Sequence, residues 1–202
     1  HSCASYTGSF VISKAELASK ALLLGSAYMD DCDWDNDGYP VFAWQVGTTL
    51  PEDLRLSTAS QLRLLAYKVN SGADTFRGKT VYLTQDIDLA SREFIPIGGD
   101  ADGDGTKFNF EGTFDGQGYA IRNLYISTNR DYTGFFGRMY GTVKNLGIQS
   151  GSVSGHNKVG GLIGCAEGTI INCYNQASVS ANTQSGGLVG QSGPVTIKNC
   201  YN

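Results

Sequence analysis

The chain has 202 residues, which is enough for one sizeable hydrophobic core or two small ones. Glycine accounts for 27 residues and proline for only 4, so we expect many tight turns between short strands rather than disorder. The formal net charge is −4, and the lysines and arginines form no basic stripe, which argues against nucleic-acid binding. No apolar run approaches the roughly 18 residues of a membrane span.

The first 47 residues differ in pattern from the rest of the chain. Ser13 and Glu16 form a capping box for a short helix that Gly25 ends, and residues 38–44 are typical of a strand after a turn. Because the chain starts at His1 and has no visible signal peptide, we expect it to be a fragment of a longer protein. We predict a segment at 1–47, a linker at 48–57 and a folded unit at 58–202.

The second unit opens with a predicted helix at 58–69. Thr58 and Gln61 form a capping box, and the helix ends at Asn70-Ser-Gly72. One face carries an apolar stripe of Leu62, Leu65, Ala66 and Val69. Residues 80–84 then alternate as a strand.

Internal repeats organise the second half of the chain. The tetrapeptides at 134–137, 161–164 and 187–190 share a Gly-x-x-Gly pattern, which recurs about every 27 residues. Asn145, Asn172 and Asn199 follow at equal intervals of the same length. Asn123 is interpreted as an earlier member of this series, at a shorter interval.

This period predicts an all-β fold, a right-handed parallel β-helix, because one coil cannot bury its own apolar face but stacked coils can. Asn123, Asn145, Asn172 and Asn199 are expected to form an asparagine ladder at one corner, where asparagine tolerates unusual backbone angles. The residues that follow them, Leu124, Leu146, Cys173 and Cys200, should point inward, so the cysteines are interpreted as buried apolar residues. A β-sandwich with two similar hairpins would not explain glycine and asparagine recurring in phase.

The helix at 58–69 is expected to cap the amino-terminal end of this β-helix. The open end of a solenoid exposes unpaired strand edges and part of its core, so a covering element is needed there.

The repeated residues resemble the GLUG motif. Val159-Gly-Gly-Leu-Ile-Gly164 and Ser185-Gly-Gly-Leu-Val-Gly190 are each followed by Asn-Cys-Tyr-Asn, and Phe94–Gly98 with Phe110–Gly118 looks like the coil that precedes such repeats. The resemblance covers roughly residues 50 to 202. It implies a repeat region of a secreted or cell-surface bacterial protein, as in the non-catalytic part of some immunoglobulin A proteases. Residues 1–47 resemble the tail of a preceding unit, so the rest of the parent repeat protein is the implied neighbour.

Two acidic loops are candidate Ca²⁺ sites. Asp100, Asp102 and Asp104, followed by Gly105 and Glu111, satisfy the spacing of a calcium-binding EF-hand loop, but strand-like segments flank them where that motif needs helices. The second loop carries Asp33, Asp35 and Asp37 before Gly38. The alternative in both places is a solvated acidic turn.

Tyr125, Tyr174 and Tyr201 each follow a predicted inward residue, so alternation places them on the outer surface. A row of exposed tyrosines would offer a platform for sugar rings, and these three are the candidate ligand-binding residues. The alternative is a tyrosine row that a neighbouring segment covers.

Catalysis is disfavoured by the sequence. H-E-x-x-H and G-x-S-x-G motifs are absent. Asp86, Asp88 and Asp115 could supply the paired carboxylates of a glycosidase, but Asp86 and Asp88 resemble a recurring structural element of the family's capping coil, and Asp115 lies in a turn, where carboxylates usually cap backbone amides. Three functions remain in view: a binding or adhesion module for a glycan or a host surface protein, a structural spacer without a ligand, and a carbohydrate-active β-helix enzyme.

Overall fold

The structure is a computed structural model that describes residues 28–29, 41–42, 53–100, 105 and 107–202. The chain divides into two units, residues 1–48 and 49–202. In the first unit β1 (Tyr28–Met29) pairs in antiparallel fashion with β2 (Val41–Phe42), which falls within the strand predicted at 38–44. The helix predicted after Ser13 lies outside the described residues.

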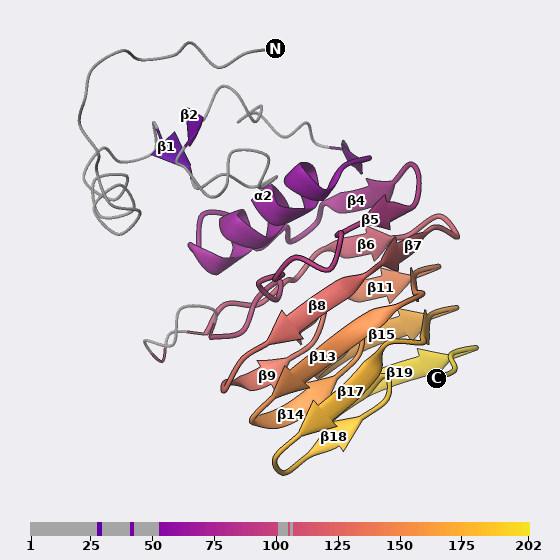
Figure 1. Cartoon of the computed structure of the whole chain (residues 1–202). Helices are drawn as coiled ribbons and strands as arrows, with labels where there is room; N and C mark the ends of the chain where they lie inside the picture. Colours follow the sequence, from indigo (N-terminus) through magenta and orange to yellow (C-terminus); the bar gives the residue numbers. More distant parts are fainter. Residues whose placement is uncertain (1–27, 30–40, 43–52, 101–104, 106) are drawn as a thin grey trace, which may run out of the picture. The chain divides into compact units, whose positions relative to one another are not determined.

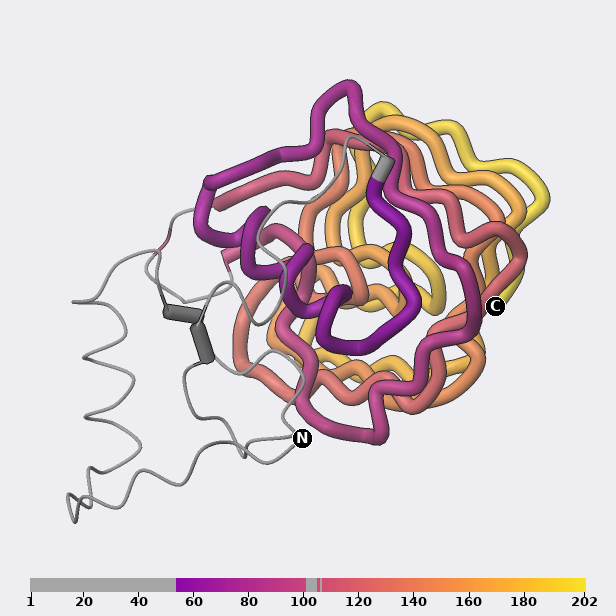
Figure 2. The backbone as a smooth tube through the Cα atoms, turned by 90° about the horizontal axis from the view of Figure 1, so that it is seen from above, coloured from indigo at the N-terminus to yellow at the C-terminus, as the bar shows by residue number. Residues whose placement is uncertain are grey.

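The second unit is a parallel β-solenoid of about five turns, as Figure 1 shows, so the β-helix prediction is confirmed. Its largest sheet, sheet 1, stacks strands along the axis in the order β3 (Asp53–Leu56), β4 (Thr80–Leu83), β6 (Thr113–Asp115), β11 (Thr142–Lys144), β15 (Ile163–Ile171) and β19 (Val189–Lys198), with β10 (Phe136–Met139) beside the first half of β15. Seen along the axis, the coils lie one behind another (Figure 2).

Three narrower sheets complete the later coils, and every pairing within them is parallel. Sheet 2 comprises β5 (Ile87–Asp88), β7 (Ala120–Arg122), β12 (Gly147–Ile148) and β16 (Tyr174–Asn175). Sheet 3 comprises β8 (Leu124–Ser127), β13 (Gly151–Gly155) and β17 (Ser178–Ala181), and sheet 4 comprises β9 (Asp131–Thr133), β14 (Asn157–Gly160) and β18 (Ser185–Gly186).

Helix α2 (Ala59–Asn70) belongs to the same hydrophobic core as the strands. Thr58 and Gln61 form the predicted capping box, and Leu62, Leu65, Ala66 and Val69 are buried. In Figures 1 and 2 the helix lies over the amino-terminal end of the stack, where it covers the core that the first coil would otherwise expose.

The stretch at 48–57, predicted as a linker, includes strand β3. Leu54 and Leu56 of β3 are buried, and β3 pairs in parallel with β4, so the first coil starts before the helix rather than after it. The pattern Leu54-Arg-Leu56 alternates, but it is too short for its periodicity to distinguish a strand from a linker.

The register of sheet 1 places one residue type in a continuous row. Thr80, Thr113, Thr142, Thr169 and Thr196 stand opposite one another in successive strands. The residues that follow them in the first four of these strands, Val81, Phe114, Val143 and Ile170, are fully buried. The interval between successive threonines falls along the chain as far as Thr142 and is constant after it, so the two coils between Thr80 and Thr142 are longer than the later ones.

A polar ladder closes the corner after this row. Asn172 donates its amide N–H to Oδ1 of Asn145 at 3.0 Å, and Asn199 donates to Oδ1 of Asn172 at 3.1 Å. Asn145 in turn donates to Oδ1 of Asp115 at 3.0 Å. The three asparagines have φ of 52° to 53°, the left-handed conformation that asparagine tolerates better than most residues.

Asn123 does not join this ladder, contrary to the sequence expectation. It lies at the next corner, where it donates to Oδ1 of Asp88 at 2.8 Å and its backbone N–H donates to Oγ of Ser150 at 2.9 Å. The coil that contains it runs from Thr113 to Thr142, which is longer than the interval from Asn123 to Asn145. That interval was therefore not a repeat.

The glycines of the repeated tetrapeptide mark close contact between coils. A Cβ on Gly164 would lie within 2.6 Å of the amide nitrogen of Thr133, and one on Gly190 within 2.6 Å of the amide nitrogen of Val159. Each glycine thus rests on the backbone of the preceding coil, where any side chain would push the coils apart.

Replacing Gly164 by alanine should lower the free energy of unfolding by about 2 kcal/mol or more, because the backbone of the preceding coil must move to admit the methyl group. Chemical denaturation measures this effect. Gly118→Asn is the control for steric contact, because no atom lies within 4 Å of the Cβ position at Gly118 and asparagine tolerates its φ of +86° better than most residues do, so its loss should be the smaller. Equal losses for the two variants would contradict this account.

Replacing Asn172 by alanine should cost about 1 to 3 kcal/mol, because two ladder hydrogen bonds are lost and a β-carbon remains in the left-handed conformation. Asn172→Gly removes the same hydrogen bonds without the backbone strain, so it should lose less stability than Asn172→Ala does. Thermal or chemical denaturation measures both losses. A stability equal to that of the unmodified chain for both variants would show that the ladder contributes nothing.

Candidate ligand-binding face

The outer surface of sheet 2 carries the strongest candidate site. Along β16 and the residue after it, Tyr174 points outward, Asn175 is 1% exposed, and Gln176 is exposed again. In the two strands below, the residues level with Gln176, which are Gln149 and Arg122, are exposed as well, so successive coils add outward polar side chains to this face.

Tyr174 and Tyr201 stack on one another at this face. Their ring centres are 5.3 Å apart and their planes differ by 9°, and Tyr201 is 60% exposed. The ring of Tyr174 lies across Gly147 of the coil below, so that any side chain at position 147 would collide with it. Gly147 therefore makes the space in which Tyr174 lies along the sheet.

Polar groups border the tyrosine pair. Arg122 donates from Nε to Oε1 of Gln149 at 2.7 Å, and its guanidinium also pairs with Asp86. Burial of the ring, the neighbouring hydroxyl of Tyr201 and the charge of Asp86 together raise the pKa of Tyr174. A stacked aromatic pair beside a guanidinium, an amide and a carboxylate can contact both the apolar C–H surface and the hydroxyl groups of a sugar.

Tyr125 lies on a different sheet from the other two tyrosines. It belongs to β8 and pairs in register with Ser152 of sheet 3, although it is 39% exposed as expected. The predicted row of three tyrosines is therefore a pair. As with Asn123, the coil that contains Tyr125 is longer than the interval that suggested a repeat, so the residue falls on another sheet.

Asn175 is a residue whose role the sequence analysis missed. Its side chain lies against Gly161, where a Cβ would collide with it, and its Nδ2 donates to the carbonyl oxygens of Ala177 at 3.0 Å and of Gly187 at 2.8 Å. It thereby joins one coil to the first glycine of the next. The recurrence of this asparagine in both Asn-Cys-Tyr-Asn segments was the available signal.

The two acidic loops fall largely outside the described residues. Asp33, Asp35, Asp37, Asp102 and Asp104 are not described, and Asp100 accepts the backbone N–H of Gly105 at 3.2 Å. Within the described part of the chain no group of three metal-ligating side chains is present. Calcium binding at these loops stays a prediction.

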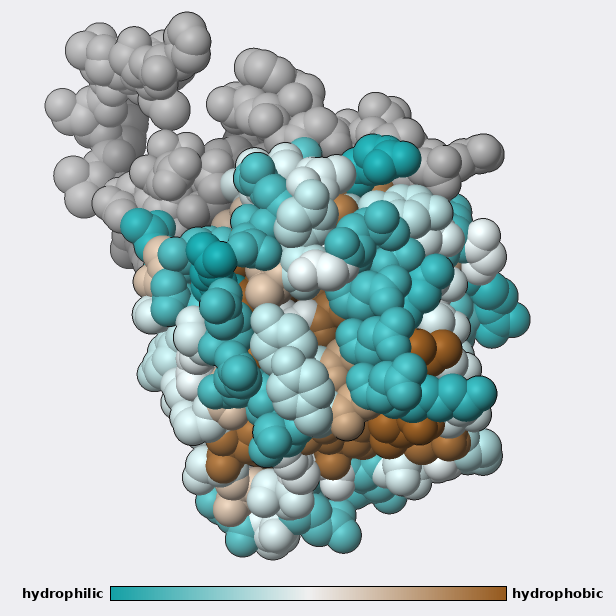
Figure 3. Space-filling view, turned by 90° about the vertical axis from the view of Figure 1, so that its right-hand side faces the viewer, coloured by the Kyte–Doolittle hydropathy of each residue, from teal (hydrophilic) through white to brown (hydrophobic). Residues whose placement is uncertain are grey.

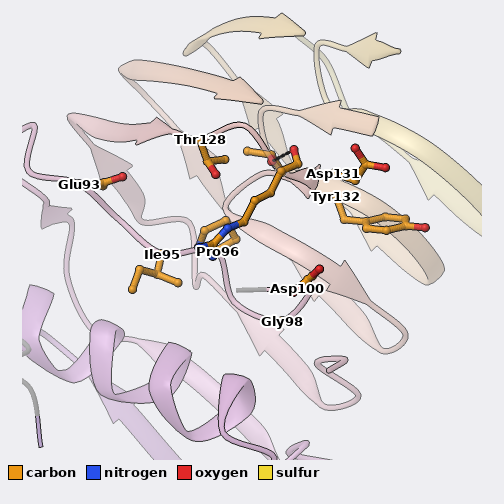
Figure 4. A pocket seen from close by; sticks show the side chains of 10 residues that line it. Glu93, Ile95, Pro96, Gly98, Asp100, Thr128, Asp131 and Tyr132 are labelled. Carbon is orange, nitrogen blue, oxygen red and sulfur yellow. Dashed lines mark hydrogen bonds between the residues drawn. The ribbon is translucent and has the colours of Figure 1, made fainter. Parts of the chain in front are cut away.

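A small pocket of about 220 Å³ lies near sheet 4 (Figure 4). Glu93, Ile95 and Pro96 line one side, and Asp131 and Tyr132 lie opposite. The pocket is smaller than the roughly 300 to 1,000 Å³ of typical small-molecule sites, so it has room for a small group rather than a polymer chain.

The cysteines of the inward row behave as apolar residues. Cys173 is 1% exposed, and burial raises its pKa to about 12, so its thiol stays protonated at neutral pH. Cys200 follows it in the next coil and packs against the same core. The thiol of Cys173 is therefore not activated as a nucleophile.

The three aspartates considered for catalysis all make structural hydrogen bonds. Asp86 accepts from the backbone N–H of Ala120 at 2.9 Å, and Asp88 accepts from that of Ala90 at 2.7 Å. Asp115 is 4% exposed and accepts from the backbone N–H of Gln117 at 2.9 Å. This is the backbone-capping role expected of carboxylates at turns.

The pKa of Asp115 lies below its ordinary value. Burial acts to raise it, but hydrogen bonds from Asn145, Gln117 and Lys144 together lower it by more. Because the folded-state pKa is depressed, the stabilisation from this carboxylate is present above the ordinary aspartate pKa and is lost as pH falls through the folded-state value.

Asp115→Asn should therefore lower the free energy of unfolding by about 1 to 3 kcal/mol at neutral pH and flatten its dependence on pH below about pH 4. Denaturant unfolding of both proteins across this range makes the comparison. Lys144→Gln removes one of the three partners of Asp115, so its free energy of unfolding should lie between those of the unmodified chain and Asp115→Asn. Parallel curves for the aspartate and asparagine forms would contradict the assignment.

One side of the molecule is shown in Figure 3, where the surface is largely polar and an apolar band crosses it near its lower edge. Among the described residues, no helix is long and apolar enough to cross a membrane.

Comparison with protein families supports the resemblance inferred from the sequence. Residues 155–180 match the model of the GLUG motif, a segment that runs from the end of β13 into β17 and so forms one coil. The chain is also similar to halomucin from Haloquadratum walsbyi, with 30% identity over 167 residues. That alignment covers 76% of this chain but only 2% of halomucin.

A solved structure has a similar fold. The crystal structure of a "putative immunoglobulin A1 protease" from Bacteroides ovatus superimposes with a TM-score of 0.53 and 26% sequence identity. The match covers 74% of this chain and 46% of that chain, so this chain corresponds to less than half of that protein.

Proposed function

From the GLUG-motif β-helix that this chain contains, we infer that it is a non-catalytic repeat module of a secreted or surface-anchored protein, and that sheet 2 binds glycan chains. The observation that carries the binding role is the stacked pair of Tyr174 and Tyr201 on an exposed strand face.

The shape of the site suits a polymer. The tyrosine pair and the outward side chains of Arg122 and Gln149 belong to successive coils, so contacts extend along the axis rather than into a cavity. An extended glycan can lie on such a face and contact several coils at once. Several weak contacts then add together in one binding event.

The absence of a catalytic role is part of the proposal. The carboxylates near sheet 2 are held by backbone N–H groups, by Arg122 or by Lys144, so none is available as an acid and base pair in the described residues. Glycoside hydrolysis needs two carboxyl groups facing one another across the scissile bond. The bound glycan is therefore expected to leave intact.

The test is binding of the purified chain to a broad glycan and mucin array, with calcium and with a chelator. Tyr201→Ala and Tyr174→Ala should each lower the affinity for a bound glycan by about tenfold. Each variant loses an aromatic contact of about 1 kcal/mol with the sugar and also removes the ring that holds the other tyrosine in place. Tyr125→Ala is the matched control, because Tyr125 is exposed but lies on sheet 3.

A glycan that binds the unmodified chain and Tyr125→Ala, but not the two other variants, supports the proposal. Dependence on calcium would add an acidic loop to the site. Binding to no glycan under either condition would favour the spacer function, which the continuous ladders alone are sufficient to serve. Shortened glycan recovered after incubation would favour an enzyme.

A further inference from the structure

Three cations gather around one tyrosine ring at the corner between β9 and β10. Nζ of Lys158 lies 4.5 Å from the ring centre of Tyr132, Cζ of Arg138 lies 5.4 Å from it, and Nζ of Lys107 lies 5.9 Å from it. The chain as a whole has a net charge of −4, and Glu93, Asp100 and Asp131 line the pocket that also contains Tyr132, so the three cations form a positive cluster beside acidic groups.

The stacking of the coils brings these residues together. Asp131 pairs with Asn157 in register and Thr133 with Val159, so Tyr132 and Lys158 occupy the same corner position in successive coils. Both have left-handed φ values, 60° for Tyr132 and 59° for Lys158, so their side chains leave the corner in the same way.

The cluster lacks a counter-charge among the described residues, where no carboxylate oxygen lies within 4.0 Å of the three cations. Asp131 lies 2.8 Å from Nδ1 of His156, and Asp100 accepts a backbone N–H. Burial raises the pKa of the neighbouring Cys165 thiol by more than the charges of Arg138 and Lys158 lower it, so this thiol stays protonated at neutral pH.

The cations also retain unused hydrogen-bond donors. Lys158 donates one N–H to the hydroxyl of Tyr132 at 3.1 Å, and Arg138 donates from Nη2 to the hydroxyl of Tyr140. The guanidinium of Arg138 lies 5.2 Å from the ring centre of Tyr140 as well as near Tyr132, and its Nε is buried without a partner. The side chain of Arg138 also hydrogen-bonds the thiol of Cys165. A guanidinium has five N–H donors and an ammonium three, so each cation keeps donors that these contacts do not use.

We propose that Lys107, Arg138 and Lys158 bind the sulfate or carboxylate group of an acidic polysaccharide. An oxyanion placed among three cations relieves their mutual repulsion and accepts charge-assisted hydrogen bonds, which are stronger than neutral ones. The aromatic rings hold the cations in place before the ligand arrives. This site lies on sheets 1 and 4 rather than on sheet 2, so it is separate from the proposed tyrosine site.

The experiment measures binding of the full chain to dextran sulfate, polygalacturonate, polyglutamate and neutral dextran by surface plasmon resonance. We expect the chain to bind the sulfated polymer, the uronate polymer or both, and not to bind neutral dextran. Its affinity should fall as the salt concentration rises from about 50 mM to about 500 mM. Binding to dextran sulfate alone would identify sulfate as the group recognised, and binding to polygalacturonate alone would identify carboxylate.

Lys158→Gln and Lys107→Gln should each weaken this binding by about tenfold, and the triple variant with Arg138→Gln should abolish it. Lys198→Gln, an exposed lysine on β19, makes the same charge change elsewhere and should bind as the unmodified chain does. The two single variants alter half-buried or exposed side chains, so they test the site even if the triple variant does not fold.

Binding that survives Tyr174→Ala and Tyr201→Ala but not the lysine variants separates this site from the glycan site on sheet 2. Failure of all acidic polysaccharides to bind at low salt would overturn the proposal. Equal binding by the lysine variants and the Lys198→Gln control would also overturn it, and so would binding to polyglutamate alone.

Discussion

The whole solenoid depends on one constraint, which is that each coil lies a single strand spacing of about 4.8 Å from the coil before it. Strand hydrogen bonds impose this distance along the sheets, but the corners must accept it as well. At the corner into sheet 1 the backbone of one coil rests directly on that of the preceding coil, and Gly164 and Gly190 are the residues that make this possible. A side chain there would separate the coils locally and strain every ladder beside it.

Because the spacing is constant, a repeated residue becomes a row. The threonines of sheet 1 form one row, and the amides of Asn145, Asn172 and Asn199 form another. Each amide is both a donor and an acceptor, so it bonds to both neighbours in the row, and at the amino-terminal end the acceptor is the buried carboxylate of Asp115. The amides at this corner thus bond to one another through their own repetition, which pairs polar groups that stacking would otherwise leave without partners.

The sequence predicted the repeat unit, the β-helix, the cap helix and the inward cysteines, because these depend on spacing and alternation within coils of constant length. It did not predict where Asn123 and Tyr125 belong, because the two coils between Thr80 and Thr142 are longer than the later ones. Asn123 therefore matches the ladder asparagines in residue type but lies at a different corner of the coil. The row of threonines from Thr80 to Thr196 would have indicated the true register, since it continues through the longer coils. The cation cluster was beyond prediction, because Lys107 and Lys158 are brought to Tyr132 only by the course of the backbone.

The rows also indicate where function can reside on such a scaffold. Inward positions stay apolar from coil to coil, and the corner after sheet 1 keeps asparagine from Asn145 to Asn199, because every member of these rows must fit the same space. Outward positions are free of this requirement, and there the type changes: sheet 2 runs from Ala120 through Gly147 to Tyr174, and the corner position of sheet 4 changes from Tyr132 to Lys158. In both places the change creates a contact between unlike neighbours, a ring lying over a glycine or an ammonium lying over a ring. A repeat protein can therefore acquire a binding site by altering one outward residue per coil, while the ladders that stabilise its fold remain as they are.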